Sequence, residues 1–261
     1  MVDPVYTPVV SAVKGLFRAL GIRFTITGED EVPTTGGAVM AINHVGYLDF
    51  MFAGLAAQKS RRLVRFMAKK EVFDHRVGGP LMRGMKHIPV DRLGAAADSY
   101  RSAVEALRRG EIVGVFPEAT ISESWELKEF KTGAARMALE AGVPLLPCVV
   151  WGSQRIFTKG RPHDLTRGTP VRIAVGPAFT PAAGSDPVAV TAELKQRMAV
   201  LLDDARASYT GTPRTPDDTW WIPRALGGTA PTIEQAALIH ARRVEERAAR
   251  KAAKARGAVG R

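Results

Sequence analysis

The stretch Ala38-Val39-Met40-Ala41-Ile42-Asn43-His44-Val45-Gly46-Tyr47-Leu48-Asp49 decides the fold of this chain. Its first five residues are all apolar and predict a buried strand. The apolar run Phe50–Ala57 after it predicts the start of a helix. A histidine and a carboxylate therefore lie five residues apart, where a strand gives way to a helix.

The spacing of His44 and Asp49 restricts how the two side chains can meet. On a regular helix, five residues turn through roughly 500°, so the side chains would point apart. They converge only if His44 lies in the turn before the helix and Asp49 in its first turn, and Gly46 supplies the loose backbone for that turn. A carboxylate that holds one imidazole nitrogen leaves the other free to take a proton. The pair is thus a candidate base and its orienting partner, although by itself this spacing is weak evidence of catalysis.

The composition is that of a globular protein, and its net positive charge favours binding to anions. The chain has 261 residues, of which 46% are hydrophobic and 24% charged, which suits one large domain or two small ones. Its formal net charge is +11, as expected for binding nucleic acid, anionic lipid headgroups or phosphorylated substrates. Its one cysteine, Cys148, lies in an apolar run and is expected in the core. We expect neither a membrane span nor a secretory signal.

Strands and helices alternate along the chain, which predicts an α/β sheet with helices on both faces. The predicted strands are 23–28, 38–42, 63–68, 111–116, 144–151 and 171–175, and the predicted helices are 4–20, 95–109, 130–141, 188–208 and 232–256. Ligand sites in such sheets gather beyond the strand ends. His44, Arg92 and Glu118 each follow an apolar run and are expected on one rim.

Two end segments stand apart from this pattern. The helix expected at 4–20 is amphipathic, which fits either packing on the domain or lying in a membrane interface. Residues 210–231 form a Pro/Gly/Trp strap, whose Trp220-Trp221 pair fits either packing or lipid contact, and residues 232–261 form a basic, alanine-rich tail. We therefore divide the chain into 1–22, 23–209, 210–231 and 232–261.

Several common site motifs are missing from the sequence. There is no Gly-x-Ser-x-Gly elbow, no P-loop and no Gly-x-Gly-x-x-Gly fingerprint. His75, His87, His163 and His240 show no metal-ligand spacing. A base at His44, with positive charge at Arg92 and Lys131, suits deprotonation of an alcohol that carries a phosphate.

Five short motifs in order resemble a known family. They are Asn43-His44-x4-Asp49, Gly84–Arg92, Phe116-Pro117-Glu118-Ala119-Thr120-Ile121-Ser122, Phe130-Lys131-Thr132-Gly133 and Val143-Pro144-Leu145-Leu146-Pro147. Together they resemble the glycerophospholipid acyltransferases, specifically the 1-acylglycerol-3-phosphate (lysophosphatidate) acyltransferases, in a variant similar to the actinobacterial branch. The resemblance covers about residues 5–200.

The resemblance implies a mixed, largely parallel sheet flanked by helices, with residues 23–209 as the acyltransferase domain and 1–22 as a membrane-associating helix. It implies transfer of a fatty acyl group from acyl-CoA or acyl carrier protein to lysophosphatidate, giving phosphatidic acid without a cofactor. Catalysis would fall to His44 and Asp49, with a nearby backbone N–H stabilising the oxyanion. Substrate binding would fall to Asn43, Gly46, Arg92, Glu118, Ala119, Thr120, Lys131 and Gly133, of which Asn43 and Gly46 would shape the turn. The expected partners are these substrates and an anionic membrane at the cytoplasmic face of the plasma membrane, with no nucleic acid, and no oligomeric state is implied.

Two departures from the family pattern keep alternatives open. Ala119 stands where the family has glycine, and Ile121 where it has an arginine that is thought to help hold the substrate phosphate. The acceptor could therefore be another lysophospholipid or a glycolipid, or the phosphate contact could shift to Arg92 and Lys131. A basic nucleic-acid-binding protein is a remote alternative, because the charge lacks interleaved aromatic residues and no helix-turn-helix pattern occurs.

Overall fold

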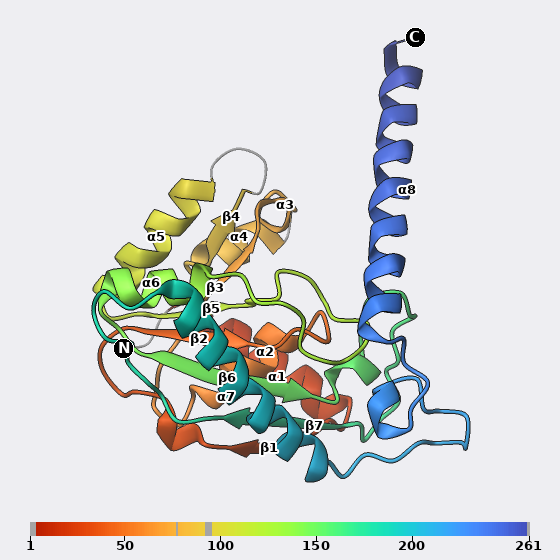
Figure 1. Cartoon of the computed structure of the whole chain (residues 1–261), viewed down its shortest axis with the longest axis horizontal. Helices are drawn as coiled ribbons and strands as arrows, with labels where there is room; N and C mark the ends of the chain where they lie inside the picture. Colours follow the sequence, from red (N-terminus) through yellow and green to blue (C-terminus); the bar gives the residue numbers. More distant parts are fainter. Residues whose placement is uncertain (1–3, 77, 92–95, 260–261) are drawn as a thin grey trace. The chain divides into compact units, whose positions relative to one another are not determined.

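A seven-stranded sheet forms the centre of the larger of two compact units, residues 1–121 and 129–212, in the computed structural model, which describes residues 4–76, 78–91 and 96–259 (Figure 1). The strand order is β1-β7-β6-β2-β5-β3-β4. The strands are β1 (Arg23–Thr27), β2 (Ala38–Ile42), β3 (Val64–Lys69), β4 (Ile88–Val90), β5 (Ile112–Val115), β6 (Leu145–Trp151) and β7 (Pro170–Val175). The sequence pattern predicted all of these strands except the short β4.

The sheet is mixed and largely parallel, as expected. Strands β6, β2, β5, β3 and β4 run parallel to one another, while β7 pairs antiparallel with β6 and β1 runs parallel to β7. The carboxyl ends of β2, β5 and β6 therefore lie side by side at one edge. Every residue of β2 is buried, because both faces of this central strand are covered.

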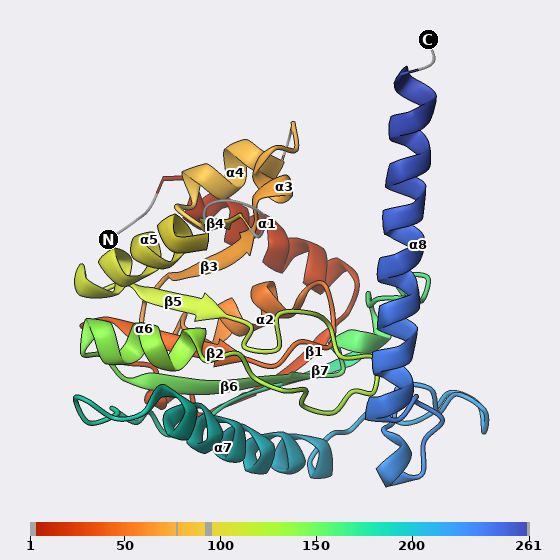
Figure 2. The same ribbon diagram turned by 45° about the horizontal axis from the view of Figure 1, so that its top comes forward.

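Helices cover both faces of the sheet (Figures 1 and 2). On one face lie α1 (Tyr6–Ala19) and α2 (Asp49–Ala56), whose Phe17 and Phe52 join the main core with rings 4.9 Å apart. The other face carries α5 (Ala96–Arg108), α6 (Gly133–Ala141) and α7 (Pro187–Ala207). The short helices α3 (Lys70–Phe73) and α4 (Gly78–Gly84) connect β3 to β4. Cys148 is fully buried in the core, as predicted.

The apolar side of α1 packs on the protein. Tyr6 is buried and donates a hydrogen bond of 3.2 Å to the carbonyl of Val64 in β3. Val9 packs beside it, and Val13 contacts the main core further along the helix. Of the two interpretations of this helix, packing on the domain accounts for these residues. The exposed residues of α1 include Leu16, at 56%, and the basic residues Lys14 and Arg18.

A second compact unit comprises residues 122–128 and 213–261. In it, α8 (Ile233–Val259) begins at a capping box, in which Thr232 and Gln235 exchange hydrogen bonds of 3.0 and 3.2 Å. The Trp125 indole donates to the carbonyl of Trp220 at 2.7 Å. Trp221 is buried, so it packs within the protein. The strap and tail thus share one unit with a segment that precedes α6.

The fold contains one buried histidine that should make stability depend on pH. His87 is 6% exposed, and its Nδ1 accepts a hydrogen bond of 3.0 Å from the backbone N–H of Phe66. Burial first, and then the positive charge of Arg65, lower the pKa of His87 from 6.5 to about 4. The unfolded chain therefore binds more protons than the folded one between these two pH values.

We predict that stability falls as the pH drops from about 6.5 to about 4, by roughly 2 to 3 kcal/mol from His87 alone. The measurement is urea unfolding at pH 7 and pH 4.5, for the wild type and for His87→Gln. The glutamine can still accept from Phe66 but cannot be protonated, so it should lose less stability on acidification. An equal loss in both proteins would contradict the assignment.

Candidate active site

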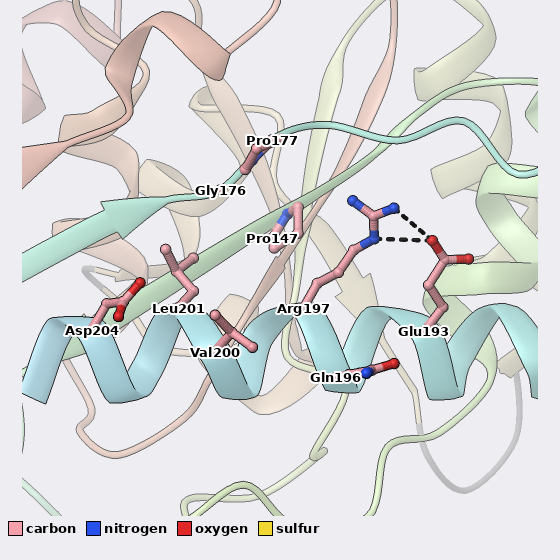
Figure 3. A pocket seen from close by; sticks show the side chains of 9 residues that line it. All are labelled: Pro147, Gly176, Pro177, Glu193, Gln196, Arg197, Val200, Leu201 and Asp204. Atoms are coloured by element: carbon pink, nitrogen blue, oxygen red, sulfur yellow. Dashed lines mark hydrogen bonds and ion pairs between the residues drawn. The ribbon is translucent and has the colours of Figure 1, made fainter.

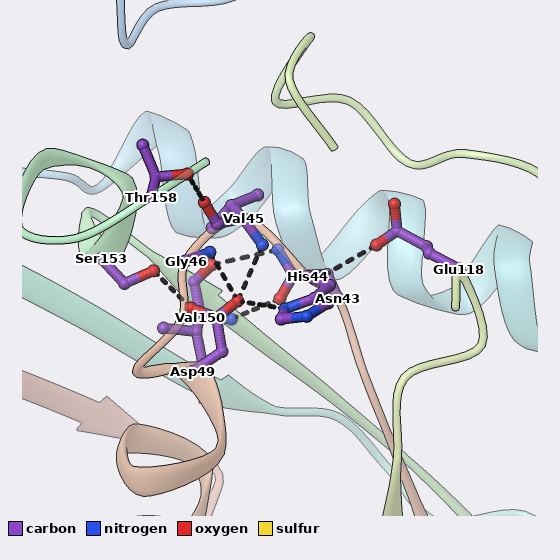
Figure 4. Close-up of polar contacts among 9 residues, drawn as sticks. All are labelled: Asn43, His44, Val45, Gly46, Asp49, Glu118, Val150, Ser153 and Thr158. Atoms are coloured by element: carbon purple, nitrogen blue, oxygen red, sulfur yellow. Dashed lines mark hydrogen bonds and ion pairs between the residues drawn. The ribbon is translucent and has the colours of Figure 1, made fainter. Parts of the chain in front are cut away.

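The structure meets the geometric requirement set by the spacing of His44 and Asp49. The turn 43–48 follows β2, and α2 begins at Asp49, so the histidine precedes the helix and the aspartate lies in its first turn. His44 Nδ1 lies 3.1 Å from Asp49 Oδ2 (Figure 4). The His44 side chain is 19% exposed, whereas Asp49 is fully buried. One ring nitrogen is therefore held by a buried carboxylate, which leaves the other nitrogen for a substrate.

The Asp49 carboxylate is surrounded by hydrogen-bond donors. Its Oδ2 accepts from the backbone N–H groups of Val45, at 2.7 Å, and Gly46, at 2.8 Å, in addition to His44. Its Oδ1 accepts from the Ser153 hydroxyl at 2.5 Å. These donors offset the cost of burying the carboxylate. They also fix which of its oxygens faces the imidazole.

Asn43 ties strands β2 and β6 together at the start of the turn. The residue is fully buried. Its side-chain amide donates to the carbonyl of Val150 at 3.0 Å and accepts from the N–H of the same residue at 2.7 Å. It thereby continues the pairing of β2 with β6 beyond the last strand residue. Both functions of the amide are used inside the protein, so Asn43 sets the start of the turn.

Gly46 is closely packed within the turn. It is buried, and a Cβ at this position would lie 2.9 Å from Ser153 Oγ and 3.2 Å from both Asp49 Oδ1 and the Phe157 carbonyl. Such contacts are tighter than ordinary packing allows. Glycine is therefore required because the turn passes directly over the carboxylate.

The loop after β5 brings Glu118 and Phe116 to the same turn. Glu118 is 4% exposed, and its Oε1 accepts from the backbone N–H of His44 at 2.8 Å. The Phe116 ring stacks on the imidazole with centroids 4.2 Å apart. The predicted meeting of His44 and Glu118 on one rim is therefore observed. The sequence pattern located Glu118 because this carboxylate follows a strand. It gave no signal that the apolar Phe116 ring stacks on the His44 imidazole.

The backbone amides of residues 44–47 all donate hydrogen bonds within the protein. The N–H of His44 donates to Glu118, and those of Val45 and Gly46 donate to Asp49. The N–H of Tyr47 donates to the Phe157 carbonyl at 2.9 Å. These four amides are used to build the turn, and which backbone N–H stabilises the oxyanion stays a prediction.

The two departures from the family pattern lie in one short segment. Ala119 has a φ of +61°, a left-handed conformation that alanine adopts only at some energetic cost and that glycine adopts freely. Thr120 is half-buried beside it, and Ile121 is 6% exposed. The side chain at the position of the family arginine is thus apolar and buried.

Of the two basic residues expected around the phosphate, Lys131 and Arg92, the structure describes only Lys131. The Lys131 side chain is exposed, while its backbone N–H donates to the Pro117 carbonyl at 2.9 Å and so ties the residue to the loop after β5. Gly133 begins α6. Arg92 lies outside the described residues.

Three further features of the described residues are the metal-ligating side chains, the buried cysteine and a hollow beside α7. Among residues 4–76, 78–91 and 96–259, no group of three or more metal-ligating side chains could hold a metal ion. Burial, and next the charge of Asp49, raise the pKa of Cys148 to about 12, so the thiol is neutral at ordinary pH. A hollow of about 460 Å³ lies between α7 and the strand ends around Pro147 and Gly176 (Figure 3). Its lining contains none of the motif residues of the turn.

Comparisons with known proteins agree with this geometry. A family model described as Acyltransferase matches residues 23–151. A 1-acyl-sn-glycerol-3-phosphate acyltransferase of Bacillus subtilis (strain 168) is 31% identical over 140 residues, covering 52% of this chain and 68% of that protein. A chloroplastic 1-acyl-sn-glycerol-3-phosphate acyltransferase of Arabidopsis thaliana is 28% identical over 184 residues, covering 69% of this chain but only 49% of that protein.

A solved structure shares the fold. The crystal structure of the 1-acyl-sn-glycerophosphate acyltransferase of Thermotoga maritima superposes with a TM-score of 0.65, covering 78% of this chain and 81% of that one at 21% identity. The chain belongs to the same acyltransferase family as the Bacillus subtilis protein.

Proposed function

We propose that this protein transfers a fatty acyl group from a thioester donor, acyl-CoA or acyl carrier protein, to the free hydroxyl of 1-acylglycerol-3-phosphate, giving phosphatidic acid. The observation that carries the proposal is the contact of 3.1 Å between His44 Nδ1 and the buried Asp49. The names of the relatives supply the acceptor, since they are 1-acyl-sn-glycerol-3-phosphate acyltransferases.

In the proposed reaction, the free nitrogen of His44 takes the proton of the acceptor hydroxyl. The hydroxyl oxygen forms a bond to the thioester carbonyl carbon, and the carbon–sulfur bond then breaks. The imidazolium returns its proton to the leaving thiolate. Asp49 holds the tautomer and stabilises the imidazolium in between. Neither an acyl-enzyme nor a cofactor is required.

The other residues of the proposed site are assigned to binding the acceptor or to shaping the turn. Lys131 and Arg92 are proposed to attract the acceptor phosphate through their positive charges. Glu118 is proposed to shape the acceptor side, with Ala119, Thr120 and Gly133 bordering it. Asn43 and Gly46 act through the shape of the turn, as their buried contacts indicate.

We predict that His44→Ala lowers acyl transfer at least about 1,000-fold, because the reaction loses its base. The protein should stay folded, since the side chain is partly exposed at the surface. The measurement is transfer from labelled acyl-CoA to lysophosphatidate by the purified variant, with circular dichroism to check the fold. His163→Ala, at an exposed histidine, is the matched control and should retain activity. Activity above a few per cent in folded His44→Ala would refute the mechanism.

A second acceptor class is favoured by one observation. Ile121 is apolar and buried where the family has an arginine, so one expected contact to the phosphate is lost. Another lysophospholipid or a glycolipid is therefore the alternative acceptor for the same chemistry.

A panel of acceptors separates the two proposals. If lysophosphatidate is the substrate, its kcat/KM should exceed that of lysophosphatidylcholine, lysophosphatidylglycerol and a lyso-glycolipid by about 10-fold or more, since each good charge-assisted contact is worth about 1.5 to 3 kcal/mol. Lys131→Ala should reduce this preference by raising KM for lysophosphatidate. A wild-type enzyme that ignores lysophosphatidate and uses another acceptor would select the alternative.

We also propose that the protein works as a peripheral protein on an anionic membrane, at the cytoplasmic face of the plasma membrane. Within the described part of the chain, no helix is both long and apolar enough to cross a bilayer. Apolar surface does lie next to the site, where the Tyr47 and Phe157 rings are 44% and 39% exposed with centroids 4.7 Å apart. The exposed Leu16, Lys14 and Arg18 of α1 are a further candidate contact. Aromatic rings and basic residues suit the headgroup region of a bilayer.

We predict that the double variant Tyr47→Ser with Phe157→Ser floats less with vesicles that contain phosphatidylglycerol. The matched control is Val188→Ser with Val200→Ser, two exposed valines of α7 that are 63% and 61% exposed. Lys14→Glu with Arg18→Glu tests α1 without deleting it, because Tyr6 and Phe17 of that helix are part of the core. Equal flotation of all variants would exclude both surfaces.

A further inference from the structure

Ser153 lies in the tightest polar contact of the site and belongs to none of the five sequence motifs. It follows β6 and Gly152, 104 positions along the chain from Asp49, and is fully buried. Its hydroxyl donates to Asp49 Oδ1 at 2.5 Å (Figure 4). We propose that Ser153 is a positioning residue, which holds the Asp49 carboxylate so that its other oxygen faces His44.

The distribution of donors over the carboxylate gives Ser153 a distinct task. Oδ2 receives three donors, all from the turn 44–46. Among the described residues, Oδ1 receives the Ser153 hydroxyl. The terminal torsion of an aspartate is soft, so a carboxylate held at one oxygen can still rotate. Ser153 holds the second oxygen and thereby fixes the plane of the carboxylate.

The backbone around Ser153 is itself fixed by the fold. Gly152 has a φ of +98°, and a Cβ there would lie 2.4 Å from the Pro170 carbonyl, so only glycine makes this turn. The N–H groups of Ile156 and Phe157 donate to the Ser153 carbonyl at 3.0 and 3.2 Å. The Ser153 side chain therefore projects from a rigid turn.

The distance between Ser153 and Asp49 is set by the sheet. Strands β2 and β6 pair directly, and Asn43 extends this pairing through its two hydrogen bonds to Val150. One strand leads into the turn that carries His44 and Asp49, and the other leads into the turn that carries Ser153. The carboxylate is thus clamped between the ends of two neighbouring strands.

Ser153 does not serve as a nucleophile in this arrangement. Its side chain has no exposed surface, and its proton is directed at the carboxylate. Within the described residues the imidazole contacts the opposite oxygen of Asp49. The inference rests on the proposed acyl transfer for its kinetic consequence, while the hydrogen bond itself can be tested separately.

The experiment is a double-mutant cycle of Ser153→Ala and Asp49→Asn. Ser153→Ala should lower kcat by about 10- to 100-fold, as expected for a misplaced catalytic group, while KM for both substrates stays within about 2-fold. In the Asp49→Asn background, Ser153→Ala should lower kcat less than about 2-fold further. Ser153→Thr, which keeps the hydroxyl, should recover most of the activity if its methyl group is accommodated.

The matched control is Thr191→Val, which removes another buried hydroxyl, one that donates to the Pro187 carbonyl at 2.7 Å on α7. It should lower thermal stability without lowering kcat. NMR signals of the His44 ring should shift in Ser153→Ala and stay in place in Thr191→Val, whatever the enzyme acts on. Additive losses of kcat in the cycle, or an unchanged kcat and ring signal in folded Ser153→Ala, would overturn the inference. If the wild type shows no acyl transfer but the His44 ring signal still shifts in Ser153→Ala, only the proposed function is refuted.

Discussion

The buried carboxylate of Asp49 is the constraint on which the rest of the site depends. A charge without exposed surface persists only if hydrogen-bond donors surround it, and the protein supplies them from His44, from two backbone amides and from Ser153. Meeting this demand fixes the turn after β2, requires glycine at position 46 and directs the imidazole toward its partner. The same contacts that make the carboxylate tolerable in the core also orient the base.

The sheet provides this carboxylate with partners from distant parts of the chain. Because β2 lies between β5 and β6, its carboxyl end receives Glu118 and Phe116 from one neighbour and Ser153 from the other. Helix α2 adds the aspartate in its first turn. The catalytic pair of the proposed reaction is therefore local in sequence, whereas the groups that hold it are not.

The proposed acceptor side of the site departs from the family pattern, whereas His44 and Asp49 match it. Ala119 and Ile121 place a strained alanine and a buried apolar side chain where the family has a glycine and an arginine. Lys131 remains at the rim as an exposed cation. The chain thus keeps the proposed base and departs from the family pattern at positions 119 and 121, which is why the acceptor is the point at which the two proposed functions diverge.

The sequence by itself determined the α/β class, six of the seven strands and the pairing of His44 with Asp49, because periodicity and spacing are local properties. It also placed Glu118 at a strand end. Only the tertiary structure decided what Asn43 and Gly46 pack against, which groups the amides of residues 44–47 bond and that Ser153 completes the carboxylate's partners. It also decided that β7 reverses direction and that residues 122–128 join the C-terminal unit. These features depend on which strands become neighbours, and residues as far apart as Asp49 and Ser153 carry no local signal of the contact that the folded sheet gives them.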